Sequence, residues 1–292
     1  MIYYNIAFNF HRDVDFQHTD SACNGGQRNH IHLAGNPVGP VVSSPLFTLH
    51  NLTISHQGHP AVHHLHGAFE AGQFTAIVGP NGGGKSTLLN ALAGVHTQFE
   101  GEIRLHNQPT VAYLPQLPAL NLDFPCSVRD LVAMGLWREL SWLKRLTAQH
   151  RERVATALAR VGLSGFEDRL LNELSSGQLQ RALFARLIVQ NAQVLLLDEP
   201  FNAIDSNTQS DLIQLLEQWR AEKRTVIAVL HDHPLVHQHF EQTLLLARSA
   251  IAWGHTSNVL NATHLFKARQ MAQAWDPHAP VCTQSRALAN PS

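Results

Sequence analysis

A glycine-rich stretch that ends in lysine and serine is the clearest chemical feature of the chain. The segment Gly79–Ser86 reads GPNGGGKS and fits the pattern G-x-x-x-x-G-K-[ST]. In such a loop, glycines let successive backbone N–H groups turn toward a phosphate, Lys85 neutralises charge, and Ser86 can bind Mg²⁺. A turn that serves packing alone is the alternative, but it would not need Lys and Ser in this register. We predict phosphate binding along Gly79, Pro80, Asn81, Gly82, Gly83, Gly84, Lys85, Ser86 and Thr87.

Two carboxylates offer the second half of a phosphate-transfer site. Asp198 and Glu199 come directly after the apolar run Val194–Leu197. Ligands of α/β folds bind at the carboxyl ends of the strands, so these acids are in a suitable place for catalysis. We expect Asp198 to hold Mg²⁺ through water and Glu199 to polarise the attacking water as a general base. A solvated acidic turn is the alternative, and a nearby phosphate loop argues against it.

The surrounding elements favour a parallel sheet. The stretch FTAIVG runs into the glycine-rich loop and STLLNALAG follows, which predicts a strand, a loop and a helix. Two unalternating apolar runs, VLLLDE and TVIAVLH, are typical of strands that are covered on both faces. A stretch with helical periodicity separates them and carries Leu212, Leu215, Leu216 and Trp219. The predicted fold class is therefore α/β.

The middle of the chain is rich in helix signals. Ser127 and Asp130 form a capping-box pattern for a helix that we expect to stop at Gly135. A second helix should begin near Thr147 and end near Gly162.

The two ends have a different character. Residues 1–45 mix Asn, Gly, His and Pro without periodicity, and we predict a poorly ordered extension. From Leu46 the sequence becomes β-like. Residues 266–292 are predicted to be a tail.

Composition excludes several classes of protein. The 292 residues carry 21 Lys+Arg and 22 Asp+Glu, with 44% hydrophobic residues, so the chain is neither disordered nor a basic nucleic-acid binder. No apolar run approaches the roughly 18 residues that would span a bilayer. The N-terminus lacks the basic cluster and the cleavage site of a secretion signal. The chain has three widely spaced cysteines, Cys23, Cys126 and Cys282, which give no disulfide framework. Their number and spacing favour a reducing compartment.

Histidine is unusually frequent. The chain has 20 histidines, so acidification to about pH 6.5 would bring the net charge to roughly +9. His59, His63, His64 and His66 could form a zinc-sensing site, because imidazole is a common zinc ligand. On a regular strand, however, His64 and His66 share a face while His63 points away, and no Cys or carboxylate lies among them. We favour solvated or packed imidazoles over a metal site.

A third motif gives the chain a family likeness. LSSGQLQR (Leu174–Arg181) precedes Val194–Glu199 at the spacing of ATP-binding cassette (ABC) ATPases, which the chain resembles over about residues 46–265. The resemblance implies a P-loop ATPase that uses ATP and Mg²⁺. It also implies a RecA-like parallel-sheet core, an antiparallel β subdomain and an inserted α-helical subdomain at about residues 117–173.

The resemblance implies roles for single residues. Gln116 in YLPQ resembles the glutamine that reaches Mg²⁺ and the attacking water. Asp205 in FNAID resembles the D-loop acid, and His231 resembles the switch histidine that contacts the γ-phosphate. His56 matches the position of the aromatic residue that stacks on adenine, although imidazole stacks more weakly than tyrosine. A solvent-exposed histidine at the end of a strand is the alternative for His56.

The LSSGQLQR segment implies a homodimer. In the family, backbone N–H groups of its serine and glycine cap the γ-phosphate that is bound to the other subunit. Ser175 and Gly177 would make this contact, and Gln178 belongs to the same motif. Ser176 stands where the family usually has glycine, and we expect its small side chain to be tolerated.

The helix-rich segment suggests what the ATPase drives. Residues 117–173 have the size of the subdomain that receives a separate integral-membrane permease in importers, and they leave no room for a long coiled coil. Trp137 and Trp142 could line the groove for the permease or lie in the subdomain core.

A further likeness suggests the cargo. YLPQ followed by LDFPCSVRDLVAMGLW, together with HPAVHHL and LLLDEPFNAID, resembles zinc/manganese-type importer ATPases. This implies a peripheral subunit at the cytoplasmic face of the inner (plasma) membrane, with a solute-binding protein as an indirect partner and no nucleic acid. Zinc is the first candidate cargo and manganese the next. Import of another solute such as an iron chelate, or a soluble non-transport ABC ATPase, are the alternatives.

Overall fold

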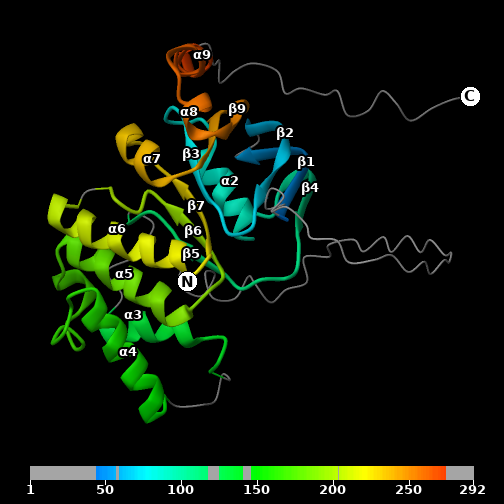
Figure 1. Cartoon of the computed structure of the whole chain (residues 1–292). Helices are drawn as coiled ribbons and strands as arrows, with labels where there is room; N and C mark the ends of the chain where they lie inside the picture. The colour runs from blue at the N-terminus through cyan, green and yellow to red at the C-terminus, as the bar shows by residue number, and fades with distance from the viewer. Residues whose placement is uncertain (1–43, 57–58, 118–124, 141–145, 203, 274–292) are drawn as a thin grey trace, which may run out of the picture.

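A computed structural model describes residues 44–56, 59–117, 125–140, 146–202 and 204–273. Its strands form a six-stranded and a three-stranded sheet, with helices on both sides of the larger one (Figure 1). Most of the predicted extension, residues 1–43, lies outside the described part of the chain. Of the predicted tail, residues 266–273 belong to a helix and residues 274–292 are not described. None of the described helices is both long and apolar enough to cross a membrane.

The larger sheet confirms the predicted parallel core. Its order is β5 (Val111–Leu114), β6 (Val194–Asp198), β7 (Thr225–Val229), β3 (Phe74–Val78), β8 (Gln242–Ala247) and β9 (Ser249–His255). All neighbours are parallel except β9, which runs antiparallel to β8 at the edge. Strands β3, β5, β6 and β7 are buried throughout, as their continuous apolar sequences predict.

The smaller sheet is antiparallel, as expected. Its order is β2 (His59–Glu70), β1 (Pro45–His56) and β4 (Phe99–Leu105). Pairing between β1 and β2 is irregular around His64, whose φ is 44°. Consequently Val62 and Leu65, three residues apart, are both buried.

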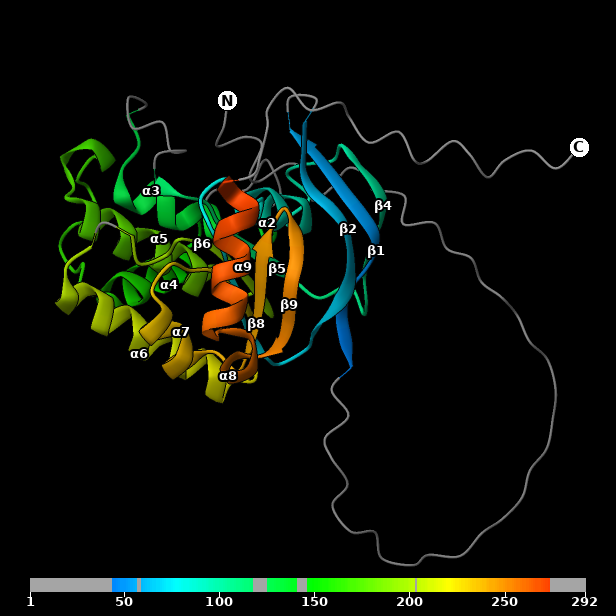
Figure 2. The ribbon, with the colours of Figure 1, turned by 90° about the horizontal axis from the view of Figure 1, so that it is seen from above.

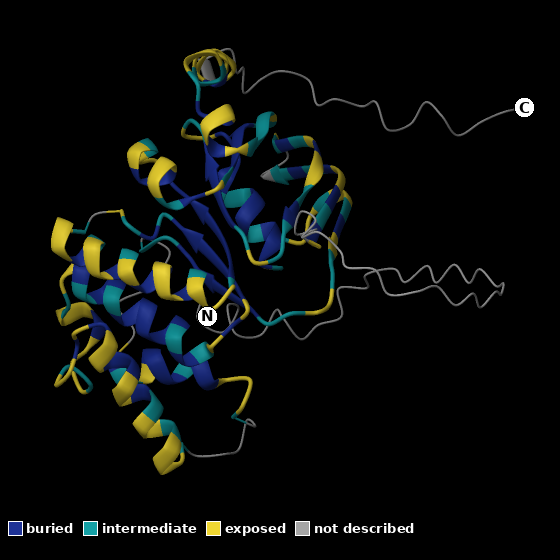
Figure 3. Cartoon of the chain, viewed as in Figure 1, coloured by how far each residue is buried: buried dark blue, intermediate teal, exposed yellow. Residues whose placement is uncertain are grey.

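Helices cover the two faces of the larger sheet. They are α2 (Lys85–Leu92), α5 (Ser176–Gln190), α6 (Ser206–Ala221), α7 (His233–His239), α8 (Thr256–Val259) and α9 (Ala262–Gln273). Alternate residues of β6 enter different apolar cores: Leu195 and Leu197 pack in one, Val194 and Leu196 in the other. The first core includes side chains of α5 and α6, and the second includes α2 and the smaller sheet. In Figures 1 and 2 these groups lie on opposite sides of the larger sheet, whose strands are buried between them (Figure 3).

The helical middle agrees with its capping signals but not with the predicted stop. It contains α3 (Val128–Ala133), the 3₁₀ turns η3 (Met134–Leu136) and η4 (Leu171–Glu173), and α4 (Ala148–Arg160). Ser127 caps α3 with Asp130 as its capping-box partner, and Thr147 caps α4. Gly135 lies inside η3 and does not stop a helix. A Cβ on Gly135 would lie 2.6 Å from the Arg186 carbonyl oxygen of α5, so this glycine permits close helix packing.

Candidate functional site

The glycine-rich loop joins β3 to α2 at the carboxyl end of the sheet. A Cβ on Gly79 would lie 1.9 Å from the Leu246 carbonyl oxygen, and one on Gly84 would lie 2.2 Å from the Ala61 carbonyl oxygen. Gly84 also caps α2 with a left-handed φ of 87°. The loop is therefore held tightly between β8 and β2, and only glycine fits these two positions. The N-terminus of α2 supplies an anion-binding position beside the loop.

Lys85 points its ammonium group into this loop. Its Nζ atom donates to the carbonyl oxygens of Gly79, at 3.0 Å, and Pro80, at 2.9 Å. The residue is 6% exposed, and burial lowers the pKa of Lys85 while Glu199 and Asp198 act in the opposite direction. A positive charge that is largely removed from solvent favours an anionic ligand such as a polyphosphate.

Three oxygen-bearing side chains meet beside Lys85. Ser86 Oγ donates to Asp198 Oδ1 at 3.0 Å, and Gln116 Nε2 donates to Ser86 Oγ at 3.3 Å. Asp198 is 3% exposed, and burial raises its pKa to about 6 despite the hydrogen bond from Ser86. A hydroxyl, a carboxylate and an amide suit Mg²⁺, which prefers oxygen ligands. A bound divalent cation would also offset the cost of burying the Asp198 charge, so these residues fit the ion.

Glu199 is held by two side chains. His231 Nε2 lies 2.8 Å from Glu199 Oε1, and Asn202 Nδ2 donates to Glu199 Oε2 at 2.9 Å. Strand pairing explains the first contact, because β6 and β7 are neighbours and Asp198 lies opposite Val229. Glu199 adopts a left-handed φ of 49°, which costs energy for a side chain other than glycine and is often seen at functional sites.

Asn202 had not been singled out from the sequence. It lies three residues after Glu199, in a turn where its N–H also donates to the Glu199 carbonyl oxygen. This spacing in the sequence could have indicated its contact with Glu199.

The LSSGQLQR residues do not approach the phosphate loop of their own chain. Ser175 caps α5: its Oγ accepts from Gln178 N at 3.2 Å, and Gln178 Oε1 accepts from Ser175 N at 3.0 Å. Helices α5 and α2 lie apart in both views (Figures 1 and 2). The LSSGQLQR helix and the phosphate-loop helix therefore lie in separate parts of the chain.

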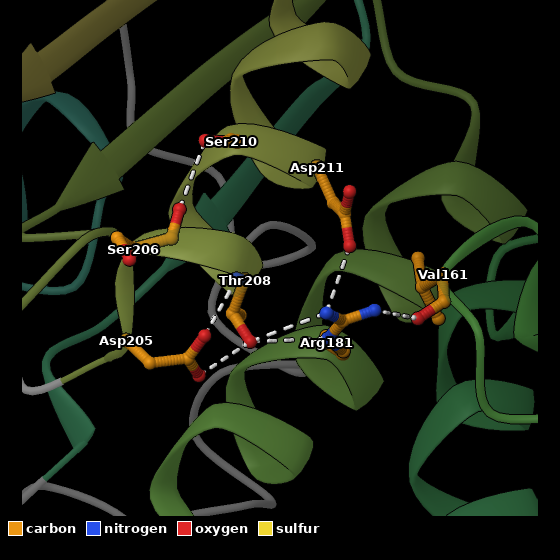
Figure 4. Close-up of polar contacts among 7 residues, drawn as sticks. All are labelled: Val161, Arg181, Asp205, Ser206, Thr208, Ser210 and Asp211. Atoms are coloured by element: carbon orange, nitrogen blue, oxygen red, sulfur yellow. Dashed lines mark hydrogen bonds and ion pairs between the residues drawn. The ribbon is translucent and has the colours of Figure 1, made fainter.

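Asp205 begins α6 and belongs to a polar cluster with α5. Its carboxylate accepts from Thr208 N at 2.9 Å and from Thr208 Oγ1 at 2.8 Å, and these two bonds hold the pKa of Asp205 below its ordinary value. Arg181 of α5 reaches Thr208 from the other side (Figure 4). A Cβ on Gly177 would lie 3.4 Å from Asp205 Oδ2, so the start of α5 packs directly on this cluster.

Comparison with known proteins identifies the arrangement. Residues 62–202 match the family described as "ABC transporter". Over 233 residues the chain is 34% identical to the manganese transport system ATP-binding protein MntB of Halalkalibacterium halodurans. The match covers 78% of this chain and 93% of MntB. The chain belongs to the ABC transporter family. As an ABC protein of this type, it is an ATPase.

Two further comparisons extend the match. The ABC protein is 35% identical to the zinc transport system ATP-binding protein TroB of Treponema pallidum, over 75% of this chain and 84% of TroB. Among solved structures, CbiO1 from Clostridium perfringens, part of the ABC transporter complex CbiONQ, has a TM-score of 0.61 at 26% identity. That match covers 76% of this chain and 93% of CbiO1. Both agree with the ABC cassette fold described above.

The structure describes the side chains of only some of the histidines between residues 56 and 66 for which a role was considered. The side chain of His56 lies outside the described residues, so its stacking role stays a prediction. His64 Nδ1 lies 2.8 Å from Asn51 Oδ1, and His66 Nδ1 accepts from Asn51 N at 3.2 Å. Within the ranges that the structure describes, no three His, Cys, Asp or Glu side chains are grouped closely enough to hold a metal ion.

Proposed function

We propose that this ABC protein is the ATP-hydrolysing subunit of a membrane importer for divalent metal ions. The likeness to ATP-binding proteins of manganese and zinc transport systems, over 93% and 84% of their lengths, carries the proposal. Zinc is our first candidate cargo and manganese the second, following the zinc/manganese-type stretches of the sequence. Import of an iron chelate and a soluble, non-transport ATPase are the alternatives, and neither named relative favours them.

The phosphate loop and its neighbours would bind the nucleotide. Residues 79–87 hold the phosphates through backbone N–H groups and Lys85, and His56 stacks on the adenine. Ser86, Asp198 and Gln116 would hold Mg²⁺, which when bound would supply positive charge against the charge that develops on the phosphates. The raised pKa of Asp198 supports this assignment, because a buried carboxylate gains most from a cation.

Hydrolysis would use the pair Glu199 and His231. Glu199 takes a proton from the attacking water as general base, and Gln116 orients that water. An ionised Glu199 requires the proton of the 2.8 Å contact to be on His231 Nε2. The same Nε2–H can then donate to a γ-phosphate oxygen when nucleotide is bound. Asn202 keeps the second Glu199 oxygen oriented.

Two copies would complete each site. We infer a homodimer in which Ser175, Gly177 and Gln178 of one subunit cap the γ-phosphate on the other, and Asp205 lies at the interface. The separation of α5 from α2 within one chain supports this inference (Figures 1 and 2). Closure of the dimer would then change the conformation of the membrane partner.

The partner would be an integral-membrane permease, with a solute-binding protein acting on it indirectly. The ABC protein would then be peripheral, at the cytoplasmic face of the inner (plasma) membrane. We assign residues 46–265 to the ATPase domain and about 117–173 to the helical subdomain that meets the permease. Trp137, 39% exposed, supports a docking role over a core role, while Trp142 lies outside the described residues.

Substitution of the general base tests the reaction. Glu199→Gln should bind ATP, lose turnover and accumulate as an ATP-bound dimer, whereas Lys85→Ala should lose nucleotide binding. Turnover at the wild-type rate in Glu199→Gln would show that another group is the base. Equilibrium binding, phosphate release and sedimentation velocity measure the three properties.

Cellular metal content tests the cargo. Deletion of the gene should lower cell zinc, measured by mass spectrometry in zinc-poor medium, and a plasmid with Glu199→Gln should not restore it. A loss of manganese alone would identify the second candidate. Unchanged zinc and manganese would exclude both candidate cargoes. Co-purification of a soluble scaffold in place of a polytopic membrane protein would then favour the non-transport alternative.

A further inference from the structure

Gln180 and Arg181, two consecutive residues of α5, donate hydrogen bonds to residues before and after Asp205 in the chain. Gln180, which is 2% exposed, donates from Nε2 to the Pro200 carbonyl oxygen at 2.6 Å. Pro200 directly follows Glu199, so this bond fixes the start of α5 to the loop that carries the general base. A buried amide that is hydrogen-bonded to backbone is a firm attachment, because leaving either group unpaired would be costly.

Arg181 makes the second attachment, on the other side of Asp205. Its Nε and Nη2 atoms donate to Thr208 Oγ1 at 3.3 and 3.2 Å, and Nη2 also reaches Asp211 Oδ2 at 2.8 Å. Its Nη1 donates to the Val161 carbonyl oxygen at 3.1 Å (Figure 4). One planar guanidinium therefore joins α5, the end of α4 and the first turn of α6.

Thr208 passes this contact on to Asp205. Its hydroxyl has one proton, which it donates to Asp205 Oδ2 at 2.8 Å. Thr208 Oγ1 must therefore be the acceptor in its contact with Arg181. Thr208 is 4% exposed, and its hydrogen-bonding roles are filled by the two flanking side chains. The result is a directional chain from Arg181 through Thr208 to Asp205, in which each bond polarises the next.

We propose that Gln180 and Arg181 form a clamp that keeps Asp205 and Glu199 in fixed positions relative to Ser175 and Gly177. Arg181 and Thr208 are then positioning residues for the ATP-dependent dimer. The inference rests on the proposed function, because the clamp matters only if these four residues meet a second copy. Capping groups must be held within a fraction of an ångström to be effective, and a clamped α5 would meet that requirement.

Variants in the Glu199→Gln background test the clamp. Thr208→Val removes the hydroxyl at nearly constant volume, Thr208→Ser keeps it, and Arg181→Met keeps the apolar stem. Arg160→Met is the matched control, since Arg160 Nη2 donates to Gln218 Oε1 at 2.7 Å and joins α4 to the opposite end of α6. Sedimentation velocity gives the dissociation constant of the ATP-bound dimer. A fluorescent nucleotide, titrated at protein concentrations below that constant, gives the affinity of the monomer.

Thr208→Val and Arg181→Met should weaken dimerisation about tenfold or more, since coupled networks commonly contribute that much. Monomer affinity for nucleotide should stay within about twofold of the parent, because the clamp does not touch the phosphate loop. Thr208→Ser and Arg160→Met should dimerise like the parent. Thr208→Val decides the matter if Arg181→Met fails to fold without its Val161 contact.

If Thr208→Val dimerises as tightly as the Glu199→Gln parent, the clamp proposal is wrong, while the proposed homodimer still stands. A parent that stays monomeric with saturating ATP would overturn the homodimer, and the clamp with it.

Discussion

Asp198 is a residue whose acid–base chemistry is changed strongly by the fold. Burial raises its pKa to about 6, against about 3.9 in an unfolded chain. Between these values the unfolded chain has released the proton and the folded chain retains it. Stability from this group therefore falls as pH rises through that window and stays low above it. The nucleotide-free protein is therefore less stable at neutral pH, because it buries a carboxylate that is arranged for a cation.

Asp198→Asn should stabilise the protein when Mg²⁺ and nucleotide are withheld. The amide keeps an acceptor for Ser86 and removes the buried charge, so we expect a gain of about 2–3 kcal/mol near pH 7.5. The gain should fall to less than about half of that near pH 4.5, where the folded carboxyl group is already protonated. Urea unfolding at both pH values measures it. An equal gain at both values would contradict the assignment to Asp198 ionisation.

Helix α5 packs against several other elements. It begins with the residues expected to meet a second copy, contacts β5 through Arg186, which donates to the Tyr113 carbonyl oxygen at 2.8 Å, and approaches η3 at Gly135. Its Phe184 ring stacks on Trp219 of α6 with ring planes 3° apart. A displacement of α5 would therefore be felt by several neighbours at once.

Gly135→Ala should push α5 and η3 apart. The new Cβ would lie 2.6 Å from the Arg186 carbonyl oxygen and 3.2 Å from Gln190 N, and both neighbours are backbone atoms of a helix. We expect a loss of about 1–3 kcal/mol of unfolding free energy, typical of an overpacked site. Chemical denaturation measures the loss. A gain in stability, as expected for alanine at an uncrowded helical position, would show that the two elements can separate without cost.

Sequence patterns predicted local features better than distant contacts. The caps at Ser127 and Thr147 were correct because each involves residues only three apart. The prediction for Gly135 was wrong because a glycine needed for close packing has the same local pattern as one that ends a helix. The reason lies in α5, some 50 residues further along the chain. The contacts of Arg181 were missed for a similar reason, because folding brings its partners from the end of α4 and from α6 to it. Asn202 was missed although its partner Glu199 is only three residues away.

At the scale of the whole molecule, the two sides of the larger sheet have different roles. The smaller sheet and α2 lie on one side, and α3 to α6 lie on the other (Figure 2). The groups proposed to bind nucleotide follow the carboxyl ends of β3, β6 and β7, whereas the exposed Trp137 belongs to the helical side. The proposed permease contact can therefore be changed without altering the phosphate site.

Trp137→Ser should separate ATP hydrolysis from partner binding. The side chain is 39% exposed, so we expect the melting temperature and the ATPase rate of the isolated protein to stay close to the parent values. Co-purification of a tagged permease should fall. Unchanged recovery of the permease would show that Trp137 does not contribute to docking. A marked loss of melting temperature would place it in the core.

The arrangement of Lys85 has a kinetic consequence. Its ammonium group is already oriented by two carbonyl oxygens of the loop that it serves. An arriving polyphosphate can replace these acceptors one at a time, so the ammonium group never has to lose all of its partners. Nucleotide capture would then proceed as a stepwise exchange of acceptors on a preformed frame. Its rate should follow the diffusion of ATP, with no slower step for rearrangement of the loop.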